Sequence, residues 1–205
     1  MNNISVILLA AGQSVRMGKK NKLLLPFKGE PLVRRSARIL SSISNSKVFV
    51  VLGHEASQVQ EALSGMEIIT TFNDFYIKGQ MSSVFHGLSK ADEAENYMIA
   101  PADLPHLSLN DCRNLLKSHQ KTEQEHITIP MLFSKNETKR GNPIILSNLA
   151  RNMVIAGGLN LGCRGLIERQ PELINAYSTK SDGFFFDIDT PASYQNEKMR
   201  NRNLL

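Results

Sequence analysis

Cations gather near the amino terminus of this chain, directly after an apolar run and a glycine. The run Val6-Ile-Leu-Leu-Ala-Ala-Gly12 is followed by Arg16, Lys19, Lys20 and Lys22. Backbone N–H groups beside small residues bind phosphate oxygens, and nearby cations neutralise the phosphate charge. The pattern therefore predicts a buried strand that ends in a polyphosphate-binding loop.

Two better-known phosphate loops do not fit this segment. A Walker A loop has four residues between its glycines and then Lys with Ser or Thr, whereas five residues separate Gly12 from Gly18 and Lys20 follows Lys19. The dinucleotide fingerprint needs three clustered glycines, and this loop has two. A core strand followed by an ordinary basic surface loop is the alternative interpretation.

Carboxylates stand at two later positions. Asp103 follows an apolar stretch and lies between Pro101 and Pro105, which stiffen the turn. A fixed carboxylate at a strand end suits a divalent cation, which prefers oxygen ligands. The alternative is a turn residue or helix cap.

The second acidic position is Phe-Phe-Phe-Asp187-Ile-Asp189-Thr-Pro191. Alternation along a strand or strand end puts Asp187 and Asp189 on one face. Pro191 then suits the first turn of a terminal helix capped by Thr190. In the alternative interpretation both carboxylates only brace that helix.

A polar cluster precedes another predicted helix. Asn73 comes first, and Gly79-Gln80-Met81-Ser82-Ser83 follows it. The two serines either cap the helix or donate to a ligand.

Several of these segments resemble one known family. Leu9-Ala-Ala-Gly-x-Ser-x-Arg-Met-Gly18, followed by Lys22-Leu-Leu-Leu-Pro26, resembles the signature of the MobA/MocA-like nucleotidyltransferases. Within that family it is most similar to the molybdenum cofactor cytidylyltransferases, including purine-catabolism accessory proteins of xanthine dehydrogenase. The segments 79–83, 102–105 and 187–191 resemble further motifs of the family.

The resemblance implies a set of site residues. It implies catalytic roles for Arg16, Lys22 and Asp103, and metal binding by Asp103, Asp187 and Asp189. It implies nucleotide binding by Leu9, Ala10, Ala11, Gly12, Lys22, Asn73, Gln80, Ser82, Ser83 and Ala102.

Two acceptor motifs of the family are altered here. Arg140-Gly-Asn142-Pro resembles an Arg-Gly-His-Pro turn, with Asn142 in place of His. Gly162-Cys-Arg164 resembles the end of Gly-Asp-x-Gly-Ala-Arg, with Leu159 and Asn160 in place of the first Gly and Asp. The resemblance implies acceptor binding by Arg140, Asn142 and Arg164.

The implied reaction moves CMP from CTP to the phosphate of molybdopterin and releases pyrophosphate, with Mg²⁺ or alternatively Mn²⁺. The Ala-Ala-Gly form of the loop resembles the cytidylyl subgroup. The resemblance also implies transient contact with a molybdoenzyme or its maturation chaperone. Two alternatives stay open: a cytidylyl- or uridylyltransferase for a sugar or polyol phosphate, and a non-catalytic carrier of the molybdenum cofactor.

Alternating strand and helix signals predict the elements that position these residues. Helices are expected over residues 30–43, 55–63, 81–91 and 109–119, and strands over 47–52, 67–71, 97–100, 126–130 and 144–146. This order predicts an α/β fold with a doubly wound, mostly parallel sheet and helices on both faces, as one domain over residues 1–205.

The composition narrows the class of protein. Hydrophobic residues make up 41% and charged residues 21% of the 205, as in globular domains. The net charge of +5 comes without a Lys/Arg stripe interleaved with aromatics, so we expect no nucleic-acid partner. Cys112 and Cys163 have no metal-ligand spacing, and the run at residues 6–11 is too short for a membrane span. We therefore expect a cytoplasmic protein without a membrane partner.

Overall fold

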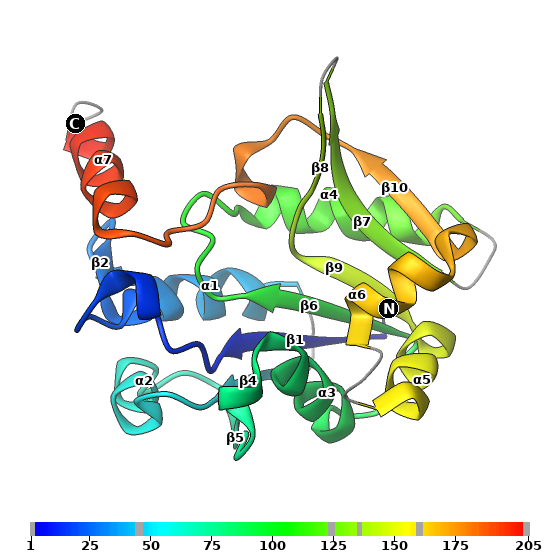
Figure 1. Ribbon diagram of the computed structural model, residues 1–205, viewed down its shortest axis with the longest axis horizontal. Coiled ribbons are helices and arrows are strands. Elements are labelled where there is room, and N and C mark those ends of the chain that lie inside the picture. The colour runs from blue at the N-terminus through cyan, green and yellow to red at the C-terminus, as the bar shows by residue number, and fades with distance from the viewer. Residues whose placement is uncertain (1–2, 44–46, 123–125, 135–136, 159–161, 203–205) are drawn as a thin grey trace.

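A mixed, mostly parallel β-sheet runs through the centre of the molecule, with helices on both faces (Figure 1). The computed structural model describes residues 3–43, 47–122, 126–134, 137–158 and 162–202. Over these residues the predicted α/β fold class is confirmed.

The strands of the main sheet follow the order β10-β7-β9-β6-β1-β4-β5, and β8 pairs with the outer part of β7. β9 is antiparallel to both of its neighbours, β8 is antiparallel to β7, and the other pairs are parallel. The strands are β1 (Ile4–Ala10), β4 (Val48–Leu52), β5 (Ile68–Phe72), β6 (Asn96–Pro101), β7 (Ile127–Phe133), β8 (Thr138–Arg140), β9 (Ile144–Ser147) and β10 (Ile174–Ser178). A separate two-stranded hairpin pairs β2 (Pro26–Phe27) with β3 (Glu30–Pro31).

Two hydrophobic clusters cover the two faces of the sheet. One contains the apolar sides of α1 (Leu32–Ser41), α2 (Ala56–Ala62) and α4 (Leu109–Gln120). The other contains those of α3 (Gln80–Lys90), α5 (Asn148–Gly157) and α6 (Gly162–Arg169). The terminal helix α7 (Pro191–Arg202) stands at one end of the molecule, where Tyr194 packs into a third cluster with Phe27 (Figure 1).

Short 3₁₀ turns connect several of these elements. They are η1 (Val15–Met17), η2 (Lys22–Leu24), η3 (Tyr76–Lys78), η5 (Pro171–Leu173) and η6 (Asp182–Phe184).

Where the structure contains a predicted helix or strand, the predicted and observed elements differ mainly in their first and last residues. The first helix begins at Leu32 instead of residue 30, because Glu30 and Pro31 form β3. The strand predicted at residues 144–146 exists as β9, but it is antiparallel. Only a short hairpin and turn join β7 to β9, and a parallel pair would need a longer crossover. No element was predicted over β10, α5 or α6.

β1 and β6 lie side by side and run parallel, with Leu9 opposite Pro101. Ala102 N–H donates to the Leu9 carbonyl at 3.1 Å, which extends this pairing past the end of β6. The loop at Gly12 and the turn at Asp103 therefore leave the same edge of the sheet, as the sequence predicts.

Candidate active site

A cavity of about 390 Å³ opens where β1 and β6 end. Its wall combines the Gly12 loop, the Asp103 turn, η3 and the start of α3. The predicted site residues that line it are Leu9, Ala11, Gly12, Arg16, Lys22, Gln80, Ser83, Ala102, Asp103 and Asp189.

Lys22 lies among the carboxylates at one side of this cavity. Its Nζ is 2.5 Å from Asp103 Oδ2 and 2.7 Å from Asp189 Oδ1. The backbone at Lys22 is held because its N–H donates to the Ser14 hydroxyl at 3.2 Å. The Asn21 side-chain oxygen accepts a hydrogen bond from Leu23 N–H and so caps the start of the turn η2. The ammonium group is therefore placed by local structure on one side and by distant carboxylates on the other.

Arg16 supplies a second, more exposed cation. Its Nη2 lies 2.6 Å from Asp189 Oδ2, and its side chain is 69% exposed. Lys19 and Lys20 are exposed and do not line the cavity. Only two of the four predicted loop cations therefore reach the carboxylate cluster.

Asp103, Asp187 and Asp189 converge to form this cluster. One oxygen from each lies within 4.8 Å of the others, although nearly half the chain separates Asp103 from the other two. Asp103 Oδ1 is buried and has no hydrogen-bond partner among the described residues. A buried carboxylate oxygen without a donor is costly, so this atom is available for a cation. The group fits a hard divalent metal, which takes several oxygen ligands.

Backbone contacts fix the two segments that carry these carboxylates. Ser36 donates its hydroxyl to the Ala102 carbonyl at 3.1 Å, and Ile188 N–H donates to the Asp103 carbonyl at 3.1 Å. Residues 186–189 form no strand, contrary to the expectation of a strand or strand end. The predicted alternation nevertheless holds, since Ile188 is buried while Asp187 is exposed.

Thr190 caps α7 as predicted, with its Oγ1 accepting from Ser193 N–H at 3.1 Å. The helix begins at Pro191. The last helix is thus capped by the Thr190 side chain, while the Asp187 and Asp189 carboxylates belong to the cluster with Asp103.

The charges in the cluster shift one another. Burial acts to lower the pKa of Lys22, but the charge and hydrogen bond of Asp103, with those of Asp189, outweigh it and raise that pKa. Partial burial, then the hydrogen bond and charge of Asp189, raise the pKa of Asp187. Burial opposes ionisation of Asp189, but hydrogen bonds from Lys22 and Asp187 prevail and lower its pKa. Lys22 is consequently a fixed positive charge at neutral pH.

Small residues keep the other wall of the cavity open. A Cβ on Gly12 would meet no atom within 4 Å, so the backbone there faces free space. Gly53, at the end of β4, allows a close approach instead. A Cβ there would lie 2.6 Å from the Tyr76 side chain and 2.8 Å from that of Ala11. This packing seats Tyr76 against the end of β1.

Asn73 and the two serines form a buried hydrogen-bonded group beside the cavity. The Asn73 side-chain amide donates to Ser82 Oγ at 3.0 Å and Ser83 Oγ at 3.1 Å. Neither serine caps α3 by accepting from its first turn, and the N-cap position is Gly79. Ser83 lines the cavity, whereas Asn73 and Ser82 do not. Asn73 and Ser82 therefore support the wall that Ser83 and Gln80 present.

Other predicted residues lie outside the cavity. Ala10 is buried and packs into the core on the opposite side of β1 from Leu9 and Ala11. Arg164 is exposed and pairs with Glu168 at 3.0 Å. Leu159 and Asn160 lie outside the described residues.

The Arg140 turn lies behind the acidic segment, away from the cavity lining. Asn142 N–H donates to the Phe184 carbonyl at 2.9 Å, and Arg140 is exposed on β8. The structure thus brings none of Arg140, Asn142 and Arg164 into the cavity, and their acceptor roles stay predictions.

Several lining residues were not predicted from the sequence. Val15, Tyr76 and Ile77 all contribute to the wall, and Val15 and Ile77 are 76% and 71% exposed. Val15 and Ile77 have purely apolar side chains, and Tyr76 belongs to no motif singled out in the sequence, so residue type gave no signal. Only Gly53, immediately after a predicted strand, marks the close packing that places Tyr76.

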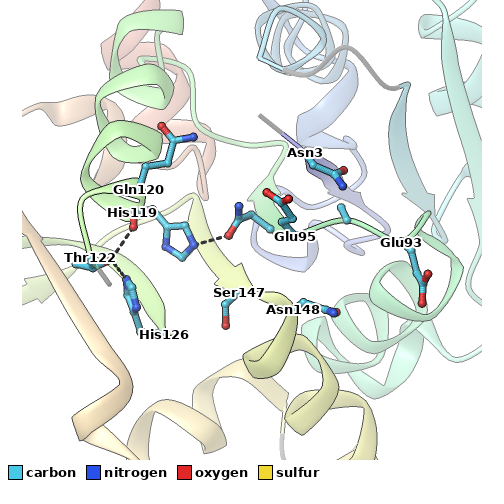
Figure 2. A pocket seen from close by; sticks show the side chains of 11 residues that line it. Asn3, Glu93, Glu95, His119, Gln120, Thr122, His126, Ser147 and Asn148 are labelled. Carbon is cyan, nitrogen blue, oxygen red and sulfur yellow. Dashed lines mark hydrogen bonds between the residues drawn. The ribbon is translucent and has the colours of Figure 1, made fainter. Parts of the chain in front are cut away.

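A larger cavity, of about 720 Å³, lies at the opposite edge of the sheet, where β1 and β6 begin (Figure 2). Glu93 and Glu95 contribute to it, and no Lys or Arg is among its described lining residues. The ring of His119 is bonded on both nitrogens, to Thr128 at 2.7 Å and Asn96 at 2.8 Å. His126 bonds the Thr122 hydroxyl. The described lining therefore supplies no Lys or Arg that would neutralise a polyphosphate.

Burial lowers the pKa of both of these histidines. It lowers the pKa of His119 to about 4, with a contribution from His126, and lowers that of His126 as well. Both rings are therefore neutral at pH 7. The carboxyl edge of the sheet, where cations and carboxylates line the cavity, is the candidate active site.

Comparisons with known proteins identify the family of this chain. A family model of the MobA-like NTP transferase domain matches residues 6–173. Among curated proteins, the chain is 27% identical over 190 residues to the nicotine blue oxidoreductase of Paenarthrobacter nicotinovorans, covering 91% of this chain and 92% of that protein.

Solved structures share the fold at lower identity. A nucleotidyl transferase from Methanothermobacter thermautotroptrophicus superposes with a TM-score of 0.77 at 21% identity, covering 100% of this chain and 99% of the other. The 4-diphosphocytidyl-2C-methyl-D-erythritol synthase of Anaerococcus prevotii gives 0.79 at 14% identity, covering 98% and 96%.

None of the described helices is long and apolar enough to cross a membrane. The family model spans the strand–loop motif at Gly12, the turn at Asp103 and most of the sheet. The chain therefore belongs to the MobA-like NTP transferase family.

Proposed function

We propose that this nucleotidyltransferase moves CMP from CTP to the phosphate of molybdopterin and releases pyrophosphate. The observation that carries the proposal is the convergence of Arg16, Lys22 and three carboxylates beside a cavity walled by Gly12 and Ala11. Cations for phosphate, carboxylates for a metal and a side-chain-free backbone are the three parts that nucleotidyl transfer needs.

In the proposed reaction an acceptor phosphate oxygen forms a bond to the α-phosphorus of CTP. The bond from that phosphorus to the bridging oxygen of pyrophosphate breaks. A phosphate monoester is already anionic at neutral pH, so the protein needs no general base. Catalysis then consists of alignment and charge neutralisation.

Named side chains divide this work. The Gly12 loop receives the phosphates on backbone N–H groups, and Arg16 and Lys22 neutralise charge as it develops on the reacting phosphate. Asp103, Asp187 and Asp189 would hold Mg²⁺, with Mn²⁺ as an alternative. The metal would supply Lewis-acid charge for the phosphate oxygens. Lys22 shares two of these carboxylates, so the metal and the ammonium group compete for the same oxygens.

The choice of CTP and molybdopterin rests on the sequence resemblance. Ala11 in the Ala-Ala-Gly loop supports CTP, since this position separates the cytidylyl form from the guanylyl form. The name of the Anaerococcus neighbour, a diphosphocytidyl compound synthase, is consistent with a cytidine nucleotide on this fold. The Paenarthrobacter relative is named an oxidoreductase, so release of pyrophosphate has to be measured directly.

The test is a pyrophosphate-release assay with purified protein, Mg²⁺, and CTP or GTP. Acceptors are molybdenum-loaded molybdopterin and a panel of sugar and polyol phosphates. The expected result is release with CTP and molybdopterin, with at least about tenfold lower kcat/KM for GTP. Pyrophosphate release only with a sugar or polyol phosphate would mean that this compound, and not molybdopterin, is the acceptor. Cofactor binding without any release would point to a carrier.

A further inference from the structure

Glu197 on α7 is a buried carboxylate that the proposed reaction does not use. It is 2% exposed, and a carboxylate is buried at high cost unless a cation or donor accompanies it. Its Oε1 lies 3.2 Å from Arg200, which belongs to the same helix and is 71% exposed. Its Oε2 lies 2.8 Å from His106 Nε2, in a geometry that forms no hydrogen bond, so this oxygen is in close contact with the ring but has no donor among the described residues. His106 is thus the partner that links Glu197 to another part of the fold.

His106 belongs to the turn that carries Asp103. It follows Pro105 directly, only three residues after the carboxylate. The carbonyl of Pro105 accepts from Arg35 of α1 at 3.1 Å, which holds the turn from its other side. A displacement of His106 would therefore be passed along a short, stiff segment to Asp103.

The ring of His106 also contacts the segment that carries the other two carboxylates. It packs against Phe186 with ring centroids 5.2 Å apart, and Phe186 immediately precedes Asp187. On another side it meets the Phe27 ring edge-on at 5.9 Å. One imidazole thus belongs to one of the segments that bring carboxylates together and packs against the other, and Glu197 is in close contact with that imidazole.

We propose that Glu197, acting through His106, is a positioning residue that keeps Asp103 and Asp187 in place for a divalent cation. The inference rests on the proposed metal-dependent function and deepens it. Three carboxylates within 4.8 Å repel one another, so their spacing needs support from the surrounding structure. Groups that orient metal ligands from behind commonly change metal affinity when they are removed.

The test measures Mn²⁺ binding to the full chain by electron paramagnetic resonance, without nucleotide. Glu197→Gln keeps the shape of the side chain and removes its charge. We expect Mn²⁺ to bind about 10- to 100-fold more weakly. In CTP turnover kcat should fall while KM for the acceptor stays the same. Arg200→Ala is the matched control because it removes the other partner of the same carboxylate, and it should leave Mn²⁺ affinity unchanged.

A second variant covers the case in which Glu197→Gln does not fold. The double variant His106→Phe/Glu197→Leu removes both polar groups together and keeps an aromatic ring between Phe27 and Phe186. Such apolar replacements of a buried pair often fold well. It should melt near the wild-type temperature and still bind Mn²⁺ more weakly. A folded variant of either kind with wild-type Mn²⁺ affinity would overturn the positioning role.

Different results would contradict the proposed nucleotidyl transfer and the proposed role of Glu197. If the wild type binds Mn²⁺ through Asp103 but transfers no nucleotide, the proposed function is wrong and the effect of Glu197 on Mn²⁺ is still measured. If the wild type turns over CTP and Glu197→Gln binds Mn²⁺ normally, only the positioning role is wrong. Wild-type protein whose Mn²⁺ binding does not depend on Asp103 would overturn the inference directly.

Discussion

The two edges of the central sheet hold cavities of opposite character. At the carboxyl edge, the smaller cavity contains Arg16, Lys22 and Asp103, whose charges meet across segments far apart in the sequence. At the amino edge, the larger cavity (Figure 2) contains His119, whose two ring nitrogens are already bonded to Thr128 and Asn96. The larger cavity therefore lies at the amino edge, whereas the charged groups that could bind a nucleotide lie at the carboxyl edge.

The two edges differ in whether their buried polar groups already have hydrogen-bond partners within the protein. Asp103 Oδ1 is buried without a described partner, beside a backbone that Gly12 leaves open. The His119 ring, in contrast, is neutral and satisfied within the fold. A ligand gains the most binding free energy where charged atoms are held in place but still lack a partner.

The largest expected effect is at Lys22. Lys22→Ala should raise the barrier to transfer by roughly 3 kcal/mol, which is about 100- to 200-fold in rate, because it removes the charge that faces the reacting phosphate. The same variant should bind Mn²⁺ more tightly, since the competing ammonium group is gone. Steady-state CTP turnover and Mn²⁺ titration measure the two effects.

The exposed cations Lys19 and Lys20 are the controls for Lys22. Lys19→Ala and Lys20→Ala should each change turnover only slightly, because neither side chain lines the cavity. Lys22→Arg should not restore full activity, because a planar guanidinium cannot replace a compact ammonium between two carboxylates. Small and equal losses at all three lysines would mean that the loop only attracts anions.

Asp103→Asn should lower turnover by about a hundredfold while folding stays nearly unchanged, because it removes a charged metal ligand and keeps the side-chain shape. The effect should be measured at limiting and at saturating Mg²⁺. Unimpaired turnover at limiting Mg²⁺ would remove Asp103 from the metal site. Mn²⁺ affinity should fall together with the rate.

Ser83→Ala should have a smaller effect, a rise in KM for CTP of about fivefold, as expected for one neutral hydrogen bond. Ser82→Ala is its partner experiment, because Ser82 is buried behind the wall and donates to loop carbonyls. We expect Ser82→Ala to lower the free energy of unfolding by about 1–3 kcal/mol and to leave KM alone. Thermal melts and CTP kinetics on both variants distinguish ligand contact from structural support.

The smallest effect on activity is expected at the amino edge. His119→Gln should leave CTP turnover near neutral pH unchanged, since the proposed reaction uses no residue of this cavity. Its effect should appear in stability instead. The folded pKa of about 4 lies below the ordinary value of 6.5, so the unfolded chain binds the proton more readily. The wild type should therefore lose stability as pH falls from about 6.5 to about 4, by roughly 3 kcal/mol, and lose no more through this group below that.

Urea unfolding from pH 4 to pH 7 measures this acid sensitivity. The slope with pH should be smaller in His119→Gln than in the wild type. Equal slopes would mean that His119 is not the group responsible. A loss of turnover at pH 7 in this variant would remove the functional contrast between the two edges.

The sequence by itself determined the pieces that depend on near neighbours. The run ending in Ala10-Ala11-Gly12 is a strand followed by a loop because its apolar residues are continuous and its glycine ends them. Thr190 and Pro191 start α7 because capping and the first helical turn are set within four residues. The parallel direction of β1, β4, β5 and β6 also follows, since a helix separates each of these strands from the next.

Tertiary structure alone decided which of these pieces meet. Lys22 touches carboxylates 81 and 167 residues away, and Glu197 reaches a histidine on another segment. Hydrophobic periodicity indicates which face of a helix or strand is buried, but it does not indicate which other element packs against that face. For the same reason β9 was expected as a strand but its antiparallel direction was not. The acceptor role expected for Arg140, which lies on exposed β8, stays a prediction. Contacts over such separations are selected by the packing of the whole sheet, which brings the ends of β1 and β6 to one edge.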